Sequence, residues 1–166
     1  ALLFRANYAT AFRAPDMGYT FGGTSGFYTS GTDYYRCAVS EPGTPIADCT
    51  YNPVSIFGLH EGNHDLKSIT AKSWGGGVVW SPTSDFNIKA DYYHINISNE
   101  VQLQDLNTLL RTESACRLGQ LDPASPTCIA ALTQVVRAAA DSPKPNVIQQ
   151  VTVLPINVSR ENVSGI

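Results

Sequence analysis

Two runs of alternating side chains, joined by a short turn, constrain the fold of this chain more than any other feature. In residues 74–80 and 86–97 the side-chain character repeats with every second residue. A period of two is typical of strands whose two faces meet different surroundings. Ser81–Asp85 between them has the composition of a turn. We therefore predict an antiparallel hairpin, in which the second strand presents on one face Phe86, Ile88, Ala90 and Tyr92.

Two more strands are expected outside this hairpin. Residues 2–12 alternate, with Leu2, Phe4, Ala6 and Tyr8 on a face suited to lipid and Arg5 and Asn7 on a face suited to water. The last segment, 147–166, is β-prone, with Pro155 marking a strand end or bulge. The fold class is therefore mainly β and antiparallel, with about four strands near residues 2–12, 72–80, 86–97 and 147–166.

Long connections alternate with the short turn. The segments 16–66 and 101–146 are far longer than ordinary connections, and a rhythm of long loops and short turns is typical of an outer-membrane barrel. The second connection has partly helical apolar spacing, and Ser125–Pro126 is a cap followed by a first-turn proline. We expect a small α-helical hairpin there.

Bulk composition excludes several classes of protein. The 166 residues carry a net charge of −3 and include 15% charged residues, which suits neither a nucleic-acid binder nor a disordered chain. No apolar run reaches the roughly 18 residues that a membrane helix needs. Strands that alternate lipid-facing and water-facing residues fit the mean hydropathy of −0.11.

A family resemblance rests on several motifs in order. Residues 5–15, Arg-Ala-Asn-Tyr-Ala-Thr-Ala-Phe-Arg-Ala-Pro, resemble the strand of TonB-dependent receptors that ends in Phe-Arg-Ala-Pro. Four further elements are similar to that family and keep its order: Gly62-Asn63 with Asp65-Leu66-Lys67, Trp80-Ser81-Pro82, Asp91-Tyr92-Tyr93-His94-Ile95, and Pro155-Ile156-Asn157-Val158. The resemblance covers most of the chain.

This resemblance implies part of a receptor in the bacterial outer membrane, with the loops near 16–66 and 101–146 facing outside. Its function would be TonB-dependent uptake of a siderophore or another scarce nutrient, without catalysis and without a cofactor. The implied partners are the rest of the barrel and its plug domain, TonB through a missing N-terminal region, outer-membrane lipid, and a small-molecule or peptide ligand, but no nucleic acid. A complete transporter barrel has about 22 strands, so the chain is expected to be a fragment.

Four cysteines suit an oxidising compartment, and three pairings are possible. They have no C-x-x-C spacing and fall as two pairs in two separate loops. We expect disulfides that join Cys37 to Cys49 and Cys116 to Cys128, each within its own loop.

Ligand contacts are expected on the long loops, because binding residues gather on loops carried by a rigid scaffold. Aromatic side chains supply large contact area at modest entropic cost. The predicted contacts are Tyr19, Phe21, Phe27, Tyr28, Tyr34 and Tyr35. The alternative is that these rings only pack the loop against itself.

Two other functions stay open at this point. His60, Glu61 and His64 match the H-E-x-x-H pattern of zinc hydrolases, which requires a helix, whereas Gly62 and Asn63 disfavour one. We therefore expect no metal site there. The other alternative is a soluble, disulfide-stabilised β module that binds carbohydrate through exposed aromatic residues. Phe12, Trp74 and Trp80 are expected at membrane interfaces instead, because they lie near strand ends.

Overall fold

The computed structural model describes residues 1–83 and 85–166, which form two compact units. Unit 1 comprises Ala1–Thr20, His64–Gln102 and Ile156–Ile166, and unit 2 comprises Phe21–Asn63 and Leu103–Pro155. Each unit therefore combines segments that lie far apart in the sequence.

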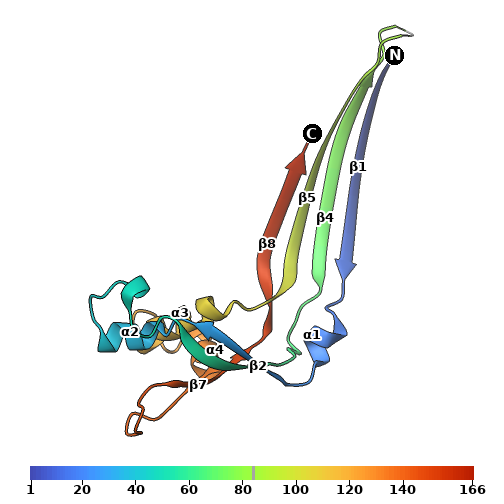
Figure 1. Ribbon diagram of the computed structural model, residues 1–166. Coiled ribbons are helices and arrows are strands. Elements are labelled where there is room, and N and C mark those ends of the chain that lie inside the picture. The colour runs from blue at the N-terminus through green and yellow to red at the C-terminus, as the bar shows by residue number, and fades with distance from the viewer. Residues whose placement is uncertain (84) are drawn as a thin grey trace. The chain divides into compact units, whose positions relative to one another are not determined.

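Unit 1 is built around one antiparallel sheet (Figure 1). Its strands are β1 (Leu2–Arg13), β4 (Ile69–Trp80), β5 (Ile88–Leu103) and β8 (Pro155–Gly165), in the order β1-β4-β5-β8. A short helix, α1 (Met17–Phe21), follows β1. The predicted hairpin is confirmed, since β4 pairs antiparallel with β5 and Trp80 lies opposite Ile88. Phe86 precedes the strand, and Ser84 of the expected turn lies outside the described residues.

The register of this sheet aligns its apolar residues in rows across three strands. Phe4 lies beside Val78, which lies beside Ala90. The same face carries three further rows, Leu2–Trp80–Ile88, Ala6–Gly76–Tyr92 and Tyr8–Trp74–His94. The alternate rows, such as Arg5–Gly77–Asp91, face the other way because successive side chains in a strand point to opposite sides. The two faces expected from the alternation are therefore confirmed.

The prediction of a single strand near 147–166 was wrong. Two strands occupy this segment, β7 (Ile148–Val153) and β8 (Pro155–Gly165), and they belong to different sheets. Pro155, which begins β8, has no N–H to donate to a ladder, so the pairing changes at this residue.

The two long connections were predicted as loops, yet together they fold into a second sheet. It contains β2 (Ser25–Gly31), β3 (Val54–His60), β7 and β6 (Val135–Arg137), in the order β2-β3-β7-β6. The parallel pairing of β3 with β7 joins one connection to the other. These strands have only three to seven residues, and β2 and β3 contain glycine, so the sequence pattern did not reveal them.

Helices cover one face of the second sheet. They are α2 (Tyr34–Ser40), α3 (Leu106–Arg117) and α4 (Pro126–Gln134), and the 3₁₀ turn η1 (Ile46–Asp48) has no buried residue. Asp105 caps α3 by accepting a hydrogen bond from the backbone N of Thr108 at 2.8 Å. Hydrogen bonding from the Thr108 side chain and backbone lowers the pKa of this carboxyl, so the cap stays ionised near neutral pH. No helix among the described residues is long and apolar enough to cross a membrane.

The hydrophobic core of unit 2 lies between this sheet and the helices. Its buried members are Ile56, Leu109, Leu110, Ala131, Val135, Ile148, Val151 and Val153. Phe27, Tyr34, Val54 and Leu106 pack against them from the edge.

A buried ion network lies beside this core. The side chain of Arg137 is 3% exposed and donates from Nε to Glu113 Oε1 at 2.7 Å and from Nη1 to Asp33 Oδ2 at 3.0 Å. Glu113, at 0% side-chain exposure, also accepts from Arg117. Burial alone would lower the pKa of Arg137, but the hydrogen bonds and charges of Glu113 and Asp33 raise it. Two carboxylates and two guanidinium groups thus join β6, α3 and the cap of α2.

Both expected disulfides are confirmed. Cys37 bonds to Cys49, and Cys116 bonds to Cys128, each across a sequence separation of 12 residues. The second bridge ties α3 to α4. All four cysteines are buried, so the bridges form part of the interior of unit 2.

Replacing Cys116 and Cys128 by serine should lower the free energy of unfolding of unit 2 by about 3 kcal/mol, since a closed loop of this length restricts the unfolded chain. The measurement is protease resistance of the connections against denaturant in the full-length receptor. Mapping of non-reduced peptides should recover the two pairs named above. A peptide joining Cys37 to Cys116 would contradict the pairing.

Replacing Arg137 by methionine should destabilise unit 2 by roughly 3–5 kcal/mol, because Asp33 and Glu113 lose a buried counter-charge. The matched control is Arg36→Met. Arg36 stacks over the Tyr51 ring at 3.8 Å, and its loss should cost about 1 kcal/mol. Equal losses of protease resistance in both variants would show that the network does not stabilise unit 2.

Candidate functional site

The six aromatic residues predicted as ligand contacts lie in three different elements. Tyr19 and Phe21 belong to α1, Phe27 and Tyr28 to β2, and Tyr34 and Tyr35 to the first turn of α2. Their surroundings differ, even between the neighbours Phe27 and Tyr28.

Phe27 belongs to the interior of unit 2. Its ring stacks on His60 with centroids 4.2 Å apart and lies directly over Gly58. A Cβ at Gly58 would approach Phe27 Cζ to 2.2 Å, so only glycine accommodates the ring there. The ring therefore closes the edge of the core.

Tyr34 and Tyr35 contact arginines of the same unit. The Tyr34 hydroxyl accepts a hydrogen bond from Arg111 Nη2 at 3.3 Å, and its ring packs against the core. The Arg137 guanidinium lies 5.1 Å from the Tyr35 ring centre. Both rings thus hold α2 in place, which matches the packing alternative weighed above.

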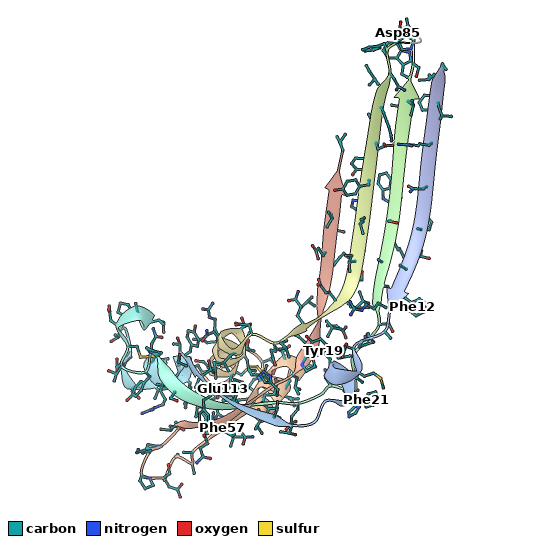
Figure 2. The ribbon with its side chains drawn as sticks, turned by 45° about the vertical axis from the view of Figure 1, so that its right-hand side comes forward. Phe12, Tyr19, Phe21, Phe57, Asp85 and Glu113 are labelled. Atoms are coloured by element: carbon teal, nitrogen blue, oxygen red, sulfur yellow. A yellow bond between two sulfur atoms is a disulfide. The ribbon has the colours of Figure 1, made fainter. Side chains whose placement is uncertain are left out.

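Tyr28 is the most exposed of the six, at 81%. It lies opposite Phe57 of β3 in the register, and the two ring centres are 5.1 Å apart. In β3 the neighbours of Phe57, Ile56 and Gly58, face the core. Phe57 therefore points to the side of the sheet opposite α3, as its position relative to Glu113 illustrates (Figure 2).

The open face of the second sheet, which we call the outer sheet face, extends from this pair across β7 to β6. Its members by register are Tyr28, Phe57, Leu59, Thr152, Gln150 and Val136. Val136 is 44% exposed. None of these six residues is charged. Thr152 and Gln150 supply neutral hydrogen-bonding groups. Such a surface suits an uncharged part of an organic or peptide ligand.

Phe57, Leu59 and Val136 were not predicted as site residues. The segment around Phe57 was predicted as part of the long loop 16–66, which is rich in Gly, Ser, Thr, Tyr and Pro. The β-prone run from Val54 to Leu59, in which Ser55 separates Val54 from Ile56, was the signal that could have indicated a strand. Its pairing with β7, about 90 residues later, was not available from local pattern.

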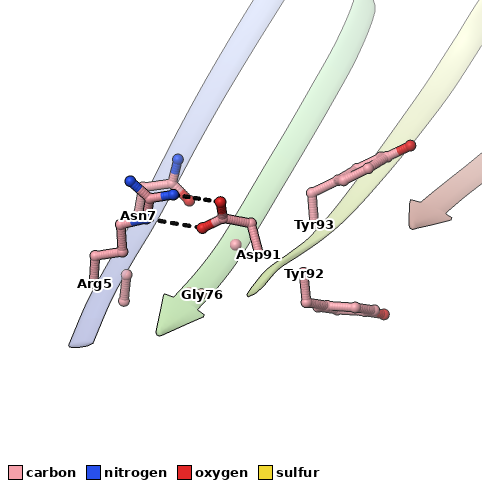
Figure 3. Close-up of a pocket in the computed structure, with 9 residues that line it drawn as sticks. Arg5, Asn7, Gly76, Asp91, Tyr92 and Tyr93 are labelled. Carbon is pink, nitrogen blue, oxygen red and sulfur yellow. Dashed lines mark hydrogen bonds and ion pairs between the residues drawn. The ribbon is translucent and has the colours of Figure 1, made fainter. Parts of the chain in front are cut away.

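The polar face of the first sheet carries a different cluster (Figure 3). Arg5 Nε donates to Asp91 Oδ1 at 2.8 Å, and a second Arg5 nitrogen contacts the other carboxylate oxygen. Lys89 Nζ lies 3.8 Å from Asp91 Oδ2. An open depression of about 370 Å³ adjoins the cluster, with Asn7 and Tyr93 in its wall. Together, Arg5, Lys89 and Asp91 carry one net positive charge.

Glycine in β4 makes this cluster possible. Arg5 and Asp91 lie on strands that flank β4, and Gly77 lies between them in the register. A Cβ at Gly77 would lie 2.0 Å from Asp91 Oδ1, so any other residue would displace the carboxylate. Because both partners are nearly half exposed, the ion pair contributes little to stability and mainly sets the polarity of this face.

The H-E-x-x-H pattern does not form the geometry of a zinc hydrolase. His60 is the last residue of β3, and residues 61–63 have no regular structure, so the helical turn that would align two imidazoles is not formed. The His60 ring is instead stacked on Phe27. The described part of the chain also contains no group of three or more metal-ligating side chains.

The chain matches the family model described as TonB dependent receptor-like, beta-barrel over residues 1–151. Neither a curated protein nor a solved structure gives a significant match. The matched range includes β1, β4 and β5, both connections and most of β7. Members of this family are transporters of the bacterial outer membrane and not enzymes. The chain therefore belongs to the family of TonB-dependent receptor β-barrels.

Proposed function

We propose that this chain forms part of an outer-membrane receptor that takes up a siderophore or another scarce nutrient with energy supplied through TonB. The family match carries the proposal, and the two faces of the first sheet support it. An apolar face suits lipid, and the face with Arg5, Lys89 and Asp91 suits a watery lumen. The rest of the barrel and the plug domain would complete the lumen.

The long connections would face the outside of the cell and the residue 81–85 turn the periplasm. Outer-membrane barrels have long external loops and short periplasmic turns. Two disulfides and a buried ion network support this orientation, because a disulfide persists in an oxidising environment and an ordered loop can hold a ligand surface rigid.

Ligand recognition would use the outer sheet face. Tyr28 and Phe57 form an aromatic platform without covering helices, and Thr152 and Gln150 offer polar contacts. Of the other predicted contacts, Tyr19 and Phe21 are exposed on α1 and remain candidates. Phe27, Tyr34 and Tyr35 would act by keeping unit 2 folded.

The test measures uptake of candidate compounds by bacterial cells. The cells carry the full-length receptor that contains this chain and no second copy of it. Cells would be offered ferric catecholates, ferric hydroxamates, haem, cobalamin and oligosaccharides in turn. We expect accumulation of one of these compounds that stops when TonB is deleted. Accumulation that is the same with and without TonB, or none from the whole panel, would contradict the proposal.

Replacing both Tyr28 and Phe57 by alanine should weaken binding of the transported compound by at least about tenfold, as expected when an aromatic hot spot is removed. The amount of folded receptor should not change, because neither ring belongs to the core. Val39→Ala, an exposed apolar site on α2, is the control and should leave binding unchanged. Wild-type affinity in the double variant would place recognition elsewhere.

A further inference from the structure

The charged side chains of the second sheet do not reach the outer sheet face. Among the described strands of this sheet, only β6 contains an Asp, Glu, Lys or Arg residue, which is Arg137. Its guanidinium is buried against Asp33 and Glu113. His60 lies on the core side of β3, where its ring stacks on Phe27. A ligand on the outer sheet face therefore meets no formal charge from these strands.

Arginines of unit 2 lie instead on its helical side. Arg111 and Arg117 of α3 are exposed, and their guanidinium groups lie 5.1 Å and 5.7 Å from the ring centres of Tyr34 and Tyr35. An anion would find counter-charges there, whereas burial on a neutral surface would cost it hydration without compensation. Glu61, which directly follows β3, carries the same sign of charge as an anion. Anionic ferric complexes therefore do not suit the outer sheet face.

Two inclined aromatic rings occupy one end of the outer sheet face. The ring planes of Tyr28 and Phe57 meet at 49°. A Cβ at Gly26 would come within 3.2 Å of the Phe57 ring, so the end of this ring lies against the glycine. Tyr28 is exposed beside it. Together the two rings form a platform that can pack against the C–H groups of a ligand.

Neutral polar side chains lie beside this platform. The register of β3 and β7 places Gln150 in the row of Phe57 and Thr152 in the row of Leu59. In the part of the chain that the structure describes, no hydrogen bond engages the side chain of Gln150 or Thr152. The amide and the hydroxyl can each donate and accept. Two strand intervals of about 4.8 Å place Gln150 roughly 10 Å from Tyr28, so the face is longer than a single six-membered ring.

We propose that the outer sheet face binds a neutral oligosaccharide. The inference rests on the proposed function and names the class of compound that the receptor takes up. A pyranose ring has an apolar C–H face, which suits Tyr28 and Phe57, and hydroxyl groups that both donate and accept, which suit Gln150 and Thr152. It carries no charge, in keeping with the strands beneath it. A free peptide would bring charged termini, for which these strands offer no partner.

The test measures binding to the purified full-length receptor by isothermal titration calorimetry. The probes are oligosaccharides of glucose, mannose and galactose, each paired with its C6-carboxylate derivative, together with a ferric catecholate and an oligopeptide. We expect one neutral oligosaccharide to bind and its carboxylate derivative to bind at least about tenfold more weakly. Gln150→Leu should weaken binding of the neutral compound about tenfold, because a sugar hydroxyl loses its partner. Gln120→Leu, in the exposed connection between α3 and α4, is the matched control and should keep the wild-type affinity.

Several results would overturn the carbohydrate surface: equal affinity for the neutral and carboxylate compounds, wild-type affinity in the Gln150→Leu variant, or binding of the catecholate or the peptide that is lost when Tyr28 and Phe57 are replaced by alanine. Uptake by the wild type is measured in parallel. If another compound is taken up with TonB and no oligosaccharide binds, the carbohydrate surface is refuted while the proposed function stands. If an oligosaccharide binds through Gln150 but uptake does not require TonB, the proposed function fails and the carbohydrate surface stands.

Discussion

The register of β1, β4 and β5 determines the chemistry of the first sheet. Because side chains alternate along a strand, a shift of one residue would exchange the apolar rows for the rows that contain Arg5 and Asp91. In lipid that exchange would bury charge in hydrocarbon and turn aromatic rings toward water, at a cost of several kcal/mol. The same register aligns Gly77 between Arg5 and Asp91 and places Lys72 beyond Trp74. The apolar rows and the polar rows of this sheet thus both depend on one pairing.

Unit 2 is under a different constraint, because its strands come from two connections that are distant in sequence. Loop closure on this scale costs entropy, and the two disulfides reduce that cost. The parallel pairing of β3 with β7 and the contacts of Arg137 with Asp33 and Glu113 then join the first connection to the second. With its helices on one side only, the sheet leaves Tyr28 exposed and Phe57 half-buried on the other. A stable scaffold and an uncovered aromatic surface therefore arise from the same arrangement.

The sequence predicted the parts of the fold that local pattern encodes. Alternation at Trp74–Trp80 and Phe86–Ile97 identified the hairpin, and Ser125–Pro126 identified the start of α4. The second sheet escaped prediction because β3 and β7 are short and their pairing is non-local. Within the predicted site, Tyr28 was found to be exposed, whereas Phe27 packs over Gly58, a contact that depends on β2 pairing with β3. Arg5 and Asp91 meet across Gly77 only through the order β1-β4-β5, which no local pattern encodes.

The central claim is that one face of the first sheet meets lipid and the other meets water. Lys89 and Ala90 are adjacent in β5 and should therefore face opposite ways at the same depth. Each would be replaced singly by cysteine in the full-length receptor and spin-labelled in a bilayer, since the four cysteines of this chain are held in disulfides. A label at residue 90 should collide mainly with dissolved oxygen, and a label at residue 89 mainly with a water-soluble nickel chelate. Equal access of the nickel chelate to both labels, or the reverse preference, would contradict the account.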